Sequence, residues 1–267
     1  MKMSKLKYGA GAMIIVLALA ACQKVINLDL GNQSGKLVVE ANITNVQGAQ
    51  YVTLSRNVPF TSQNVYPPVT GATVSLKDHA GNIFPFTEGP AGTYSVPNLQ
   101  GVTGNTYYLS VTTGGKTYSA QSTMPAAVAL DSITAHDDLF EASKGKKRIT
   151  VHFQDPPNVA NQYRFVEYVN HKQVKSVYAF DDQFINGKYV SLDLEQNDIS
   201  IYARDTVTVE MQCIDKPVYT YWYTLMQQQQ DNPGGQVAPS DPTTNITPAT
   251  LGYFSAHTTQ TLTLVVK

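Results

Sequence analysis

Short runs in which apolar and polar residues alternate recur along most of this chain, and this period-two pattern decides its fold class. The run Gln50–Ser55 places Val52 and Leu54 on one face and polar groups on the other. Successive side chains of a β-strand point to opposite faces, so such a run predicts a strand with one buried face. The alternation returns at Gly71–Lys77 and Tyr107–Thr112. The chain is therefore predicted to be mainly β.

Turn residues separate these runs, which recur about every 8 to 12 residues, as is typical of a β-sandwich. The Gly114–Gly115 pair fits a two-residue hairpin turn. The 16 tyrosines and a charged fraction of 15% suit a secreted all-β protein. Residues 36–125 are predicted to form an N-terminal Ig-like or transthyretin-like β-sandwich. The short links favour antiparallel pairing, because parallel strands need long crossovers.

A second, antiparallel β-rich domain is predicted over residues 126–267, with its boundary at the proline and small residues of Met124–Ala127. One segment breaks its β pattern. Pro217–Gln230 has apolar residues at helical spacing, and Pro217 suits the first turn of a helix. This domain therefore carries one helix near residues 217–230, and its last strand is expected at Thr259–Val265.

The N-terminal stretch Met1–Cys22 has the form of a secretory signal. Lysines precede a short apolar run, which is shorter than the roughly 20 residues that a membrane-spanning helix needs. The ending Leu19–Cys22 resembles the lipobox of bacterial lipoproteins, in which the cysteine carries the lipid. Residues 1–21 are thus expected to be removed, and residues 22–35 to form a tether lipidated at Cys22. The alternative is an uncleaved anchor with a chance cysteine.

Charge and cysteine content exclude several classes. The formal net charge is −1 and the one basic run, Lys144–Arg148, lies at an expected turn, so no nucleic-acid partner is predicted. With Cys22 acylated, Cys213 stands alone in an apolar alternating run and is expected to be a buried, inert thiol. None of the 5 histidines has metal-ligand spacing.

No motif for nucleophilic, phosphate or zinc chemistry occurs, so no catalytic residue, metal or cofactor is predicted. Two readings stay open from the acidic residues. In the first, some of these carboxylates come together in space as a calcium site. In the second, two of them form the carboxylate pair of a glycosidase. The acidic residues considered are Asp137, Asp138, Asp155, Asp181 and Asp182.

Aromatic residues are the candidates for binding, because aromatic faces stack on sugars and bury protein partners. Four tyrosines on neighbouring strands are assigned as ligand-facing or partner-facing: Tyr163, Tyr168, Tyr178 and Tyr189. The alternative for each ring is the sandwich core. Trp222, on the predicted helix, is expected in the core. The ligand implied is a glycan or a peptide.

Two short motifs, Asp131–Ile133 and Asp205–Val207, resemble the acceptor of periplasmic O-glycosylation in Bacteroidota. Ser132 is expected in an accessible loop after the domain boundary, whereas Thr206 is expected to open a strand. Ser132 is therefore the first candidate for glycosylation and Thr206 the second.

Several pieces in order resemble one family: Cys22 with Val25–Leu30, Lys36–Glu40, Val52–Arg56, Gly71–Val74, Gly92–Tyr94, Lys116–Tyr118 and Leu251–Ala256. They are similar to the Bacteroidota outer-membrane lipoproteins of the domain-of-unknown-function 4249 family. Gly71–Ser119 also resembles the transthyretin-like or carboxypeptidase-regulatory-like sandwich. Asn27 departs from the acidic residue expected there.

The resemblance implies a place in the cell and carries no catalytic residues. Gln23 after the cysteine implies the outer membrane, on its periplasmic face or at the cell surface. The expected function is non-enzymatic: an accessory binding component of a surface or nutrient-uptake complex, with a TonB-dependent receptor as partner. The alternatives are a structural or adhesive surface protein without a small ligand and, more remotely, a glycan-acting enzyme.

Overall fold

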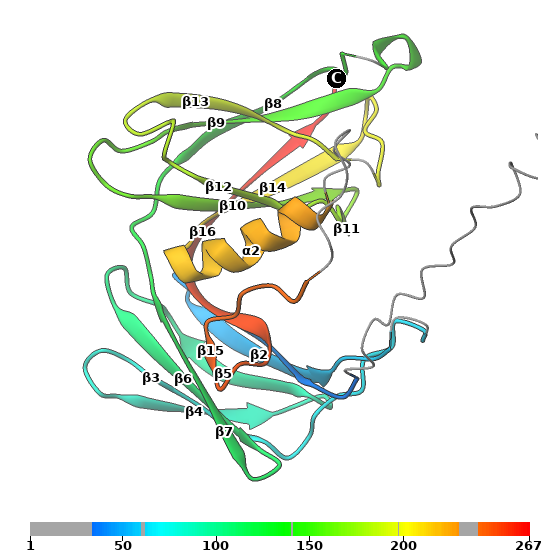
Figure 1. Cartoon of the computed structure of the whole chain (residues 1–267). Coiled ribbons are helices and arrows are strands. Elements are labelled where there is room, and N and C mark those ends of the chain that lie inside the picture. The colour runs from blue at the N-terminus through cyan, green and yellow to red at the C-terminus, as the bar shows by residue number, and fades with distance from the viewer. Residues whose placement is uncertain (1–33, 60–61, 140, 197, 230–239) are drawn as a thin grey trace, which may run out of the picture. The chain divides into compact units, whose positions relative to one another are not determined.

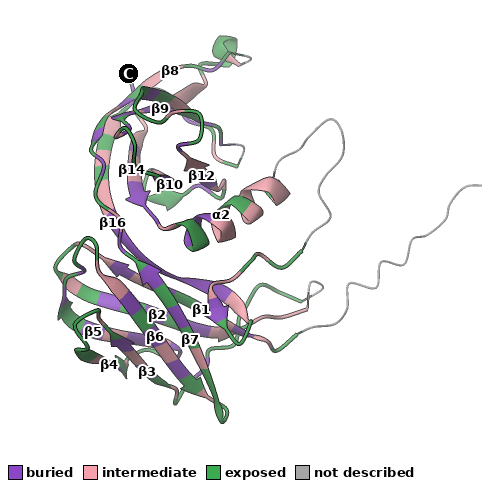
Figure 2. Ribbon diagram, turned by 60° about the vertical axis from the view of Figure 1, so that its left-hand side comes forward, coloured by how far each residue is buried: buried purple, intermediate pink, exposed green. Residues whose placement is uncertain are grey.

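A computed structural model of the whole chain describes residues 34–59, 62–139, 141–196, 198–229 and 240–267. The predictions for residues 1–33, which include the signal peptide, Cys22 and most of the tether, lie outside this range. The described chain is mainly β with one α-helix, as the alternation of side chains predicted. In Figure 2 buried and exposed residues alternate along several strands, which is the pattern of a sheet with one covered face.

The first part of the chain forms a β-sandwich (Figure 1). Its first sheet holds β1, β2 and β5, and its second holds β3, β6 and β7. Strand β4 pairs with both β3 and β5 and so joins the two sheets. The strands are β1 (Leu37–Thr44), β2 (Gly48–Arg56), β3 (Thr73–Lys77), β4 (Ile83–Glu88), β5 (Thr93–Leu99), β6 (Thr106–Thr113) and β7 (Lys116–Thr123).

The second part packs a three-stranded sheet, in the order β13-β9-β8, against strands β10, β14 and β16. A short 3-10 turn, Ala142–Lys144, links β8 to β9, where the basic run was expected at a turn. The strands are β8 (Leu130–Asp137), β9 (Lys147–Gln154), β10 (Gln162–Val169), β11 (Lys172–Gln173), β12 (Tyr178–Asp181), β13 (Tyr189–Leu194), β14 (Thr206–Cys213), β15 (Ile246–Thr247) and β16 (Leu251–Val265).

Strand β16 belongs to both parts. Its first half pairs in parallel with β1, and its second half pairs antiparallel with β14. Phe254 and Ala256 therefore pack in the core of the first sandwich, while Leu262 and Leu264 pack against the second core. The last strand is thus longer than the expected Thr259–Val265, and its N-terminal half completes the first sandwich.

Along the chain, Met124 still belongs to the first hydrophobic core and Val128 is the first residue of the second, close to the expected boundary. Residues from the far end of the chain nevertheless return to the first core, because β15 pairs with β7 as well. All described residues form one compact unit, Ser34–Lys267. The division at residues 125 and 126 therefore marks where one core ends along the chain, while the pairing of β15 and β16 crosses it.

The helix predicted near residues 217–230 is α2, Lys216–Gln229. It packs on the outer side of β10 and beside β12 (Figure 1), with Val218 and Tyr219 buried. Within the described ranges, no helix is both long and apolar enough to span a membrane.

Candidate functional site

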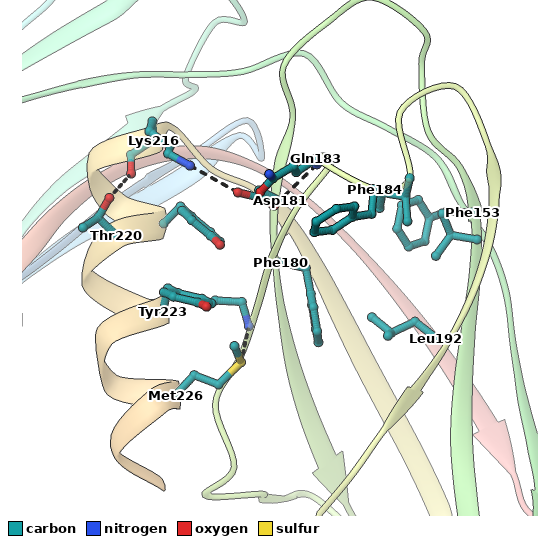
Figure 3. A pocket seen from close by; sticks show the side chains of 14 residues that line it. Phe153, Phe180, Asp181, Gln183, Phe184, Leu192, Lys216, Thr220, Tyr223 and Met226 are labelled. Carbon is teal, nitrogen blue, oxygen red and sulfur yellow. Dashed lines mark hydrogen bonds and ion pairs between the residues drawn. The ribbon is translucent and has the colours of Figure 1, made fainter. Parts of the chain in front are cut away.

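A pocket of about 540 Å³ lies between α2, β12 and β13 (Figure 3). Its size is that of a small-molecule or side-chain site. The strands contribute Phe180 from β12, Val190 and Leu192 from β13, and Phe153 from β9. The turn before β13 adds Phe184.

One face of α2 supplies the opposite wall. Lys216, Tyr219, Tyr223 and Met226 line the pocket, together with Thr220. Residues three or four positions apart lie on the same face of an α-helix, so this spacing alone brings these side chains together. The helix therefore presents two phenol rings, a thioether and one ammonium group to the strands (Figure 3).

The polar groups gather at one end of the pocket. Lys216 Nζ lies 3.3 Å from Asp181 Oδ2 and 4.4 Å from the centroid of the Tyr219 ring. Tyr219 and Tyr223 stack at 5.3 Å between centroids. Burial, with the Asp181 carboxylate next in importance, raises the pKa of Tyr219 to about 12. Tyr219 therefore stays a neutral phenol, and the charged groups at this end of the pocket are the ion pair of Lys216 and Asp181.

Aromatic surface at this pocket is left in contact with water. The side chain of Phe184 is 78% exposed and Tyr223 is 39% exposed. Phe180 is only half-buried against the second core. Exposed apolar groups that gather beside a cavity often mark an interaction site, whereas single exposed apolar residues are common on any protein surface. The pocket is therefore the candidate binding site of the described chain.

The sequence-predicted tyrosines do not form this site. Tyr163 and Tyr178 are buried in the second core, so the prediction that they face a ligand is wrong. The Tyr163 hydroxyl donates to Asp155 Oδ1, and the Tyr178 hydroxyl donates to Glu167 Oε2 at 3.2 Å. Burial is the main cause that raises the pKa of both phenols. Their role is to satisfy buried carboxyl groups.

The other two tyrosines lie elsewhere. Tyr189 is 58% exposed, but its ring stacks near His152, on the face of β13 that points away from the pocket. Tyr168 is half-buried on β10. The residue that sequence reasoning missed is Phe184, which stands in a turn and belongs to no periodic pattern. Its only sequence signal is the apolar pair Phe184–Ile185 between polar residues of a turn.

The prediction that Trp222 lies in the core holds only in part, because the residue packs against the buried cluster around Val218 without being fully buried itself. It is half-buried, and its ring lies 3.6 Å from Arg164 Cζ and 4.9 Å from the Tyr253 ring. Arg164 Nη1 also donates to Gln212 Oε1 at 2.9 Å. Trp222 therefore covers a guanidinium group on the outer face of β10, where a cation–π contact stabilises both.

The family model described as "Domain of unknown function (DUF4249)" matches residues 23–263. The chain belongs to this family. The match starts directly after Cys22, and it includes both sandwiches and the pocket of this DUF4249 chain. No curated protein matches it.

Solved structures that resemble the DUF4249 chain are all-β but only distantly similar. A two-domain fibronectin type-III segment of chicken tenascin has 12% identity, a TM-score of 0.22, and coverage of 67% of this chain and 90% of its own. The adhesin InvE of Yersinia pseudotuberculosis has 18% identity, a TM-score of 0.22, and coverage of 66% and 55%. A bacterial ice-binding adhesin has 16% identity, a TM-score of 0.21, and coverage of 88% and 66%. Such low scores carry no functional argument.

The two glycosylation candidates both lie in strands. Ser132 was expected in a loop, but it lies in β8, next to an irregularity in the pairing with β9. It is half-buried, and β8 is an edge strand. Thr206 opens β14 as expected, and its N–H donates to Asn170 Oδ1 at 3.0 Å. Sugar attachment at either residue stays a prediction.

The remaining chemical candidates have structural partners. Cys213 is buried, as predicted, and burial raises the pKa of its thiol. Asp155 accepts from the N–H of Gly187 at 2.9 Å, and Asp182 accepts from the N–H of Asn161 at 3.0 Å. Among the described residues, no group of three or more His, Cys, Asp or Glu side chains is placed to hold a metal ion.

Proposed function

We propose that this chain is a lipoprotein held at the outer membrane through lipid on Cys22, and that it acts without catalysis as an accessory binding component of a surface or nutrient-uptake complex. Its partner in this proposal is a TonB-dependent receptor. The aromatic pocket between α2, β12 and β13 is the observation that carries the binding role. The family match from residue 23 to 263 fits a mature chain that starts at Cys22.

The chemistry of the pocket supports binding rather than turnover. Asp181 is paired with Lys216, and the Thr220 hydroxyl donates to the Lys216 carbonyl oxygen at 2.9 Å. These groups are bonded within the protein, so in this proposal they give the pocket a fixed polar end against which a ligand is oriented. The phenols of Tyr219 and Tyr223 provide broad apolar contact with a polar tip, as is typical of recognition surfaces.

Affinity purification from native outer membrane tests the proposal. The tagged wild-type chain is expected to bring a TonB-dependent receptor with it after mild detergent extraction. Phe184→Ala removes an exposed ring at the pocket, and co-purification is expected to fall at least fivefold. Tyr51→Ala is the matched control, because Tyr51 is 53% exposed on β2 and lies outside the pocket lining.

The results separate the alternatives. If no receptor co-purifies, the uptake role is wrong, and a structural or adhesive role takes its place. If the receptor co-purifies equally with both variants, the pocket is not the contact. If purified protein cleaves glycans, and Asp181→Asn abolishes the cleavage, the non-enzymatic assignment is wrong.

A further inference from the structure

Strand β13 has one free edge beside the pocket. It ends the sheet of order β13-β9-β8 and, among the described strands, pairs only with β9. The N–H of Asp155 donates to the carbonyl oxygen of Lys188 at 2.9 Å, in the same register as β13 and β9. Hydrogen-bonded and non-hydrogen-bonded pairs alternate along an antiparallel ladder. The backbone N–H and C=O groups of Val190 and Leu192 therefore point toward β9. The backbone groups of Tyr189, Ser191 and Asp193 therefore point outward.

The pocket lies where the next strand of this sheet would place its inward side chains. Val190 and Leu192 are the inward residues of β13, and both line the pocket. The opposite wall comes from Phe180 and from Tyr219 and Tyr223 on α2. In a strand added beside β13, every second side chain points to the same face of the sheet as Val190 and Leu192. Its residues opposite Val190 and Leu192 therefore point into the pocket.

The edge of β12, across the pocket, is already occupied. The N–H of Val177, just before β12, donates to Gln229 Oε1 at 2.9 Å, and the N–H of Ala179 contacts Met226 Sδ at 3.4 Å. Side chains of α2 thus cover this edge. On β13, in contrast, no backbone hydrogen bond joins the outer edge to another described segment. An uncovered edge is a template for strand addition.

The sequence of β13 does not protect its edge. It contains neither lysine nor proline, the residues that usually block pairing at an edge. Its charged residue, Asp193, accepts hydrogen bonds from Thr150 Oγ1 at 2.6 Å and from His136 Nε2 at 3.2 Å. The side chain is therefore held against its own sheet and leaves the backbone edge open.

We propose that the pocket receives an extended segment of a partner polypeptide, which pairs antiparallel with β13 and buries two large apolar side chains between β13 and α2. This inference rests on the proposed binding function and names its ligand class. Strand addition of this kind takes its affinity from backbone bonds and its specificity from pockets for alternate side chains.

With antiparallel pairing, the charges beside β13 set the end residues of the segment. Exposed Lys188 precedes β13, and the largely exposed Glu195, which also pairs with Arg148 Nη1 at 3.3 Å, follows it. An antiparallel segment starts at the acidic end and finishes at the basic end. It is therefore expected to begin with a basic residue and to end with an acidic one.

The lining favours a peptide over a glycan. Val190, Leu192, Ile185 and Phe180 are aliphatic or aromatic, and the charged pair Asp181–Lys216 lies at one end only. A sugar ring carries hydroxyl groups around its whole rim, and each one that is buried without a partner weakens binding. Alternating apolar side chains match this lining without such a loss.

The probe is a synthetic peptide of about eight residues, in which phenylalanine and leucine alternate with threonine between an initial lysine and a final glutamate. The control peptide has the same residues with phenylalanine and leucine adjacent. Binding to the wild-type chain is measured by calorimetry. We expect the alternating peptide to bind at least tenfold more tightly than the control, because only alternation puts both side chains into the pocket.

Ser191→Pro tests the backbone pairing itself. Proline removes one outward N–H and is tolerated on the free side of an edge strand. The alternating peptide is expected to bind at least tenfold more weakly to this variant, and within twofold of wild type to Ser191→Ala. Hydrogen exchange of the wild-type chain gives a second measurement, since residues 189–194 are expected to exchange more slowly when the peptide is bound.

The outcomes distinguish this inference from the function on which it rests. Unchanged exchange at residues 189–194 with bound peptide overturns strand addition. Equal binding of the peptide to the Ser191→Pro variant and to wild type also overturns strand addition. If Phe180→Ala abolishes binding in that case, the side-chain pocket and the binding function remain in place. Tighter binding of a mixed oligosaccharide than of the peptide overturns the ligand class. If receptor co-purification fails as well, the proposed function is lost with it.

Discussion

Cys22 is the residue on which the proposed location depends. Two or three acyl chains hold a protein durably at a membrane, because each buried methylene contributes about 0.8 kcal/mol. Cys22→Ala is expected to abolish incorporation of labelled palmitate and recovery of the chain in outer-membrane fractions. Cys213→Ala is the control and keeps the label, since Cys213 is buried in the second core. Label that remains in the Cys22 variant rejects the anchor.

Glu167 is a buried carboxyl group that makes stability depend on pH. It is 1% exposed, and its Oε1 atom has no hydrogen-bond partner in the described part of the chain. Burial raises the pKa of Glu167 from 4.5 to about 7 in the folded state. Between these values the folded state holds the extra proton. The free energy of unfolding therefore falls as pH rises from 4.5 to 7.

Each unit of pKa shift corresponds to about 1.4 kcal/mol. The free energy of unfolding is therefore expected to fall by on the order of 3 kcal/mol across this pH range. Glu167→Gln keeps an acceptor for Tyr178 and cannot ionise. It is expected to be more stable than wild type at pH 8 and to lose the slope between pH 4.5 and 7, as measured by urea unfolding. Glu195→Gln, on a largely exposed side chain, keeps the slope. An unchanged slope in the Glu167 variant contradicts the assignment.

At the scale of elements, local pattern predicted most of the strands and the one helix, because period-two and 3.6-residue spacing need only neighbouring residues. The site was harder to predict. Strand β10 is covered by the sheet of β8, β9 and β13 on one face and by α2 on the other. Most of its residues are buried, so alternation no longer tells which tyrosine faces solvent. Tyr163 was assigned to the surface for this reason.

Pairings between distant segments also escaped prediction. The pocket needs the turn at Phe184, strand β13 and helix α2 to meet, and no sequence period encodes that meeting. The first half of β16 also escaped prediction, because Gly252–His257 is buried throughout and shows no alternation, so only Thr259–Val265 was expected as a strand. Most elements were therefore predictable, and their neighbours were not.

Helix α2 is fixed at its start by Asp215. One carboxylate oxygen accepts from Ser122 Oγ at 2.8 Å and from the N–H of Thr123 at 2.9 Å, and the other accepts from the N–H of Val218 at 3.2 Å. Asp215→Ala removes an N-terminal cap and leaves donors of β7 unpaired. We expect a loss of about 2 kcal/mol in the free energy of unfolding.

Chemical denaturation measures this loss, with Asp131→Ala as the control. Asp131 is exposed on β8, so its removal is expected to change stability by less than about 0.5 kcal/mol. Equal stability of the two variants means that the cap does not hold α2. In that case the pocket wall is set by the packing of Val218 and Tyr219 alone.

At the scale of the whole molecule, β16 makes the two cores depend on each other. Phe254 lies in the first core, and Leu264 packs against the second. One strand thus carries side chains of both. A change that loosens the pairing of β16 with β1 is therefore expected to weaken the entire described chain and to leave a single unfolding transition.

Gly252 is the position at which this coupling is tested. Its φ of +94° favours glycine, and an added Cβ would collide with the carbonyl group of Val39 on β1. Gly252→Ala is expected to cost on the order of 1–3 kcal/mol and to lower the melting temperature. Gly48→Ala is the control, because open space surrounds that position. Calorimetry is expected to show a single transition shifted to lower temperature, since β16 cannot leave the first core without loosening the second. Two resolved transitions, with only one of them shifted, would show that the sandwiches unfold independently.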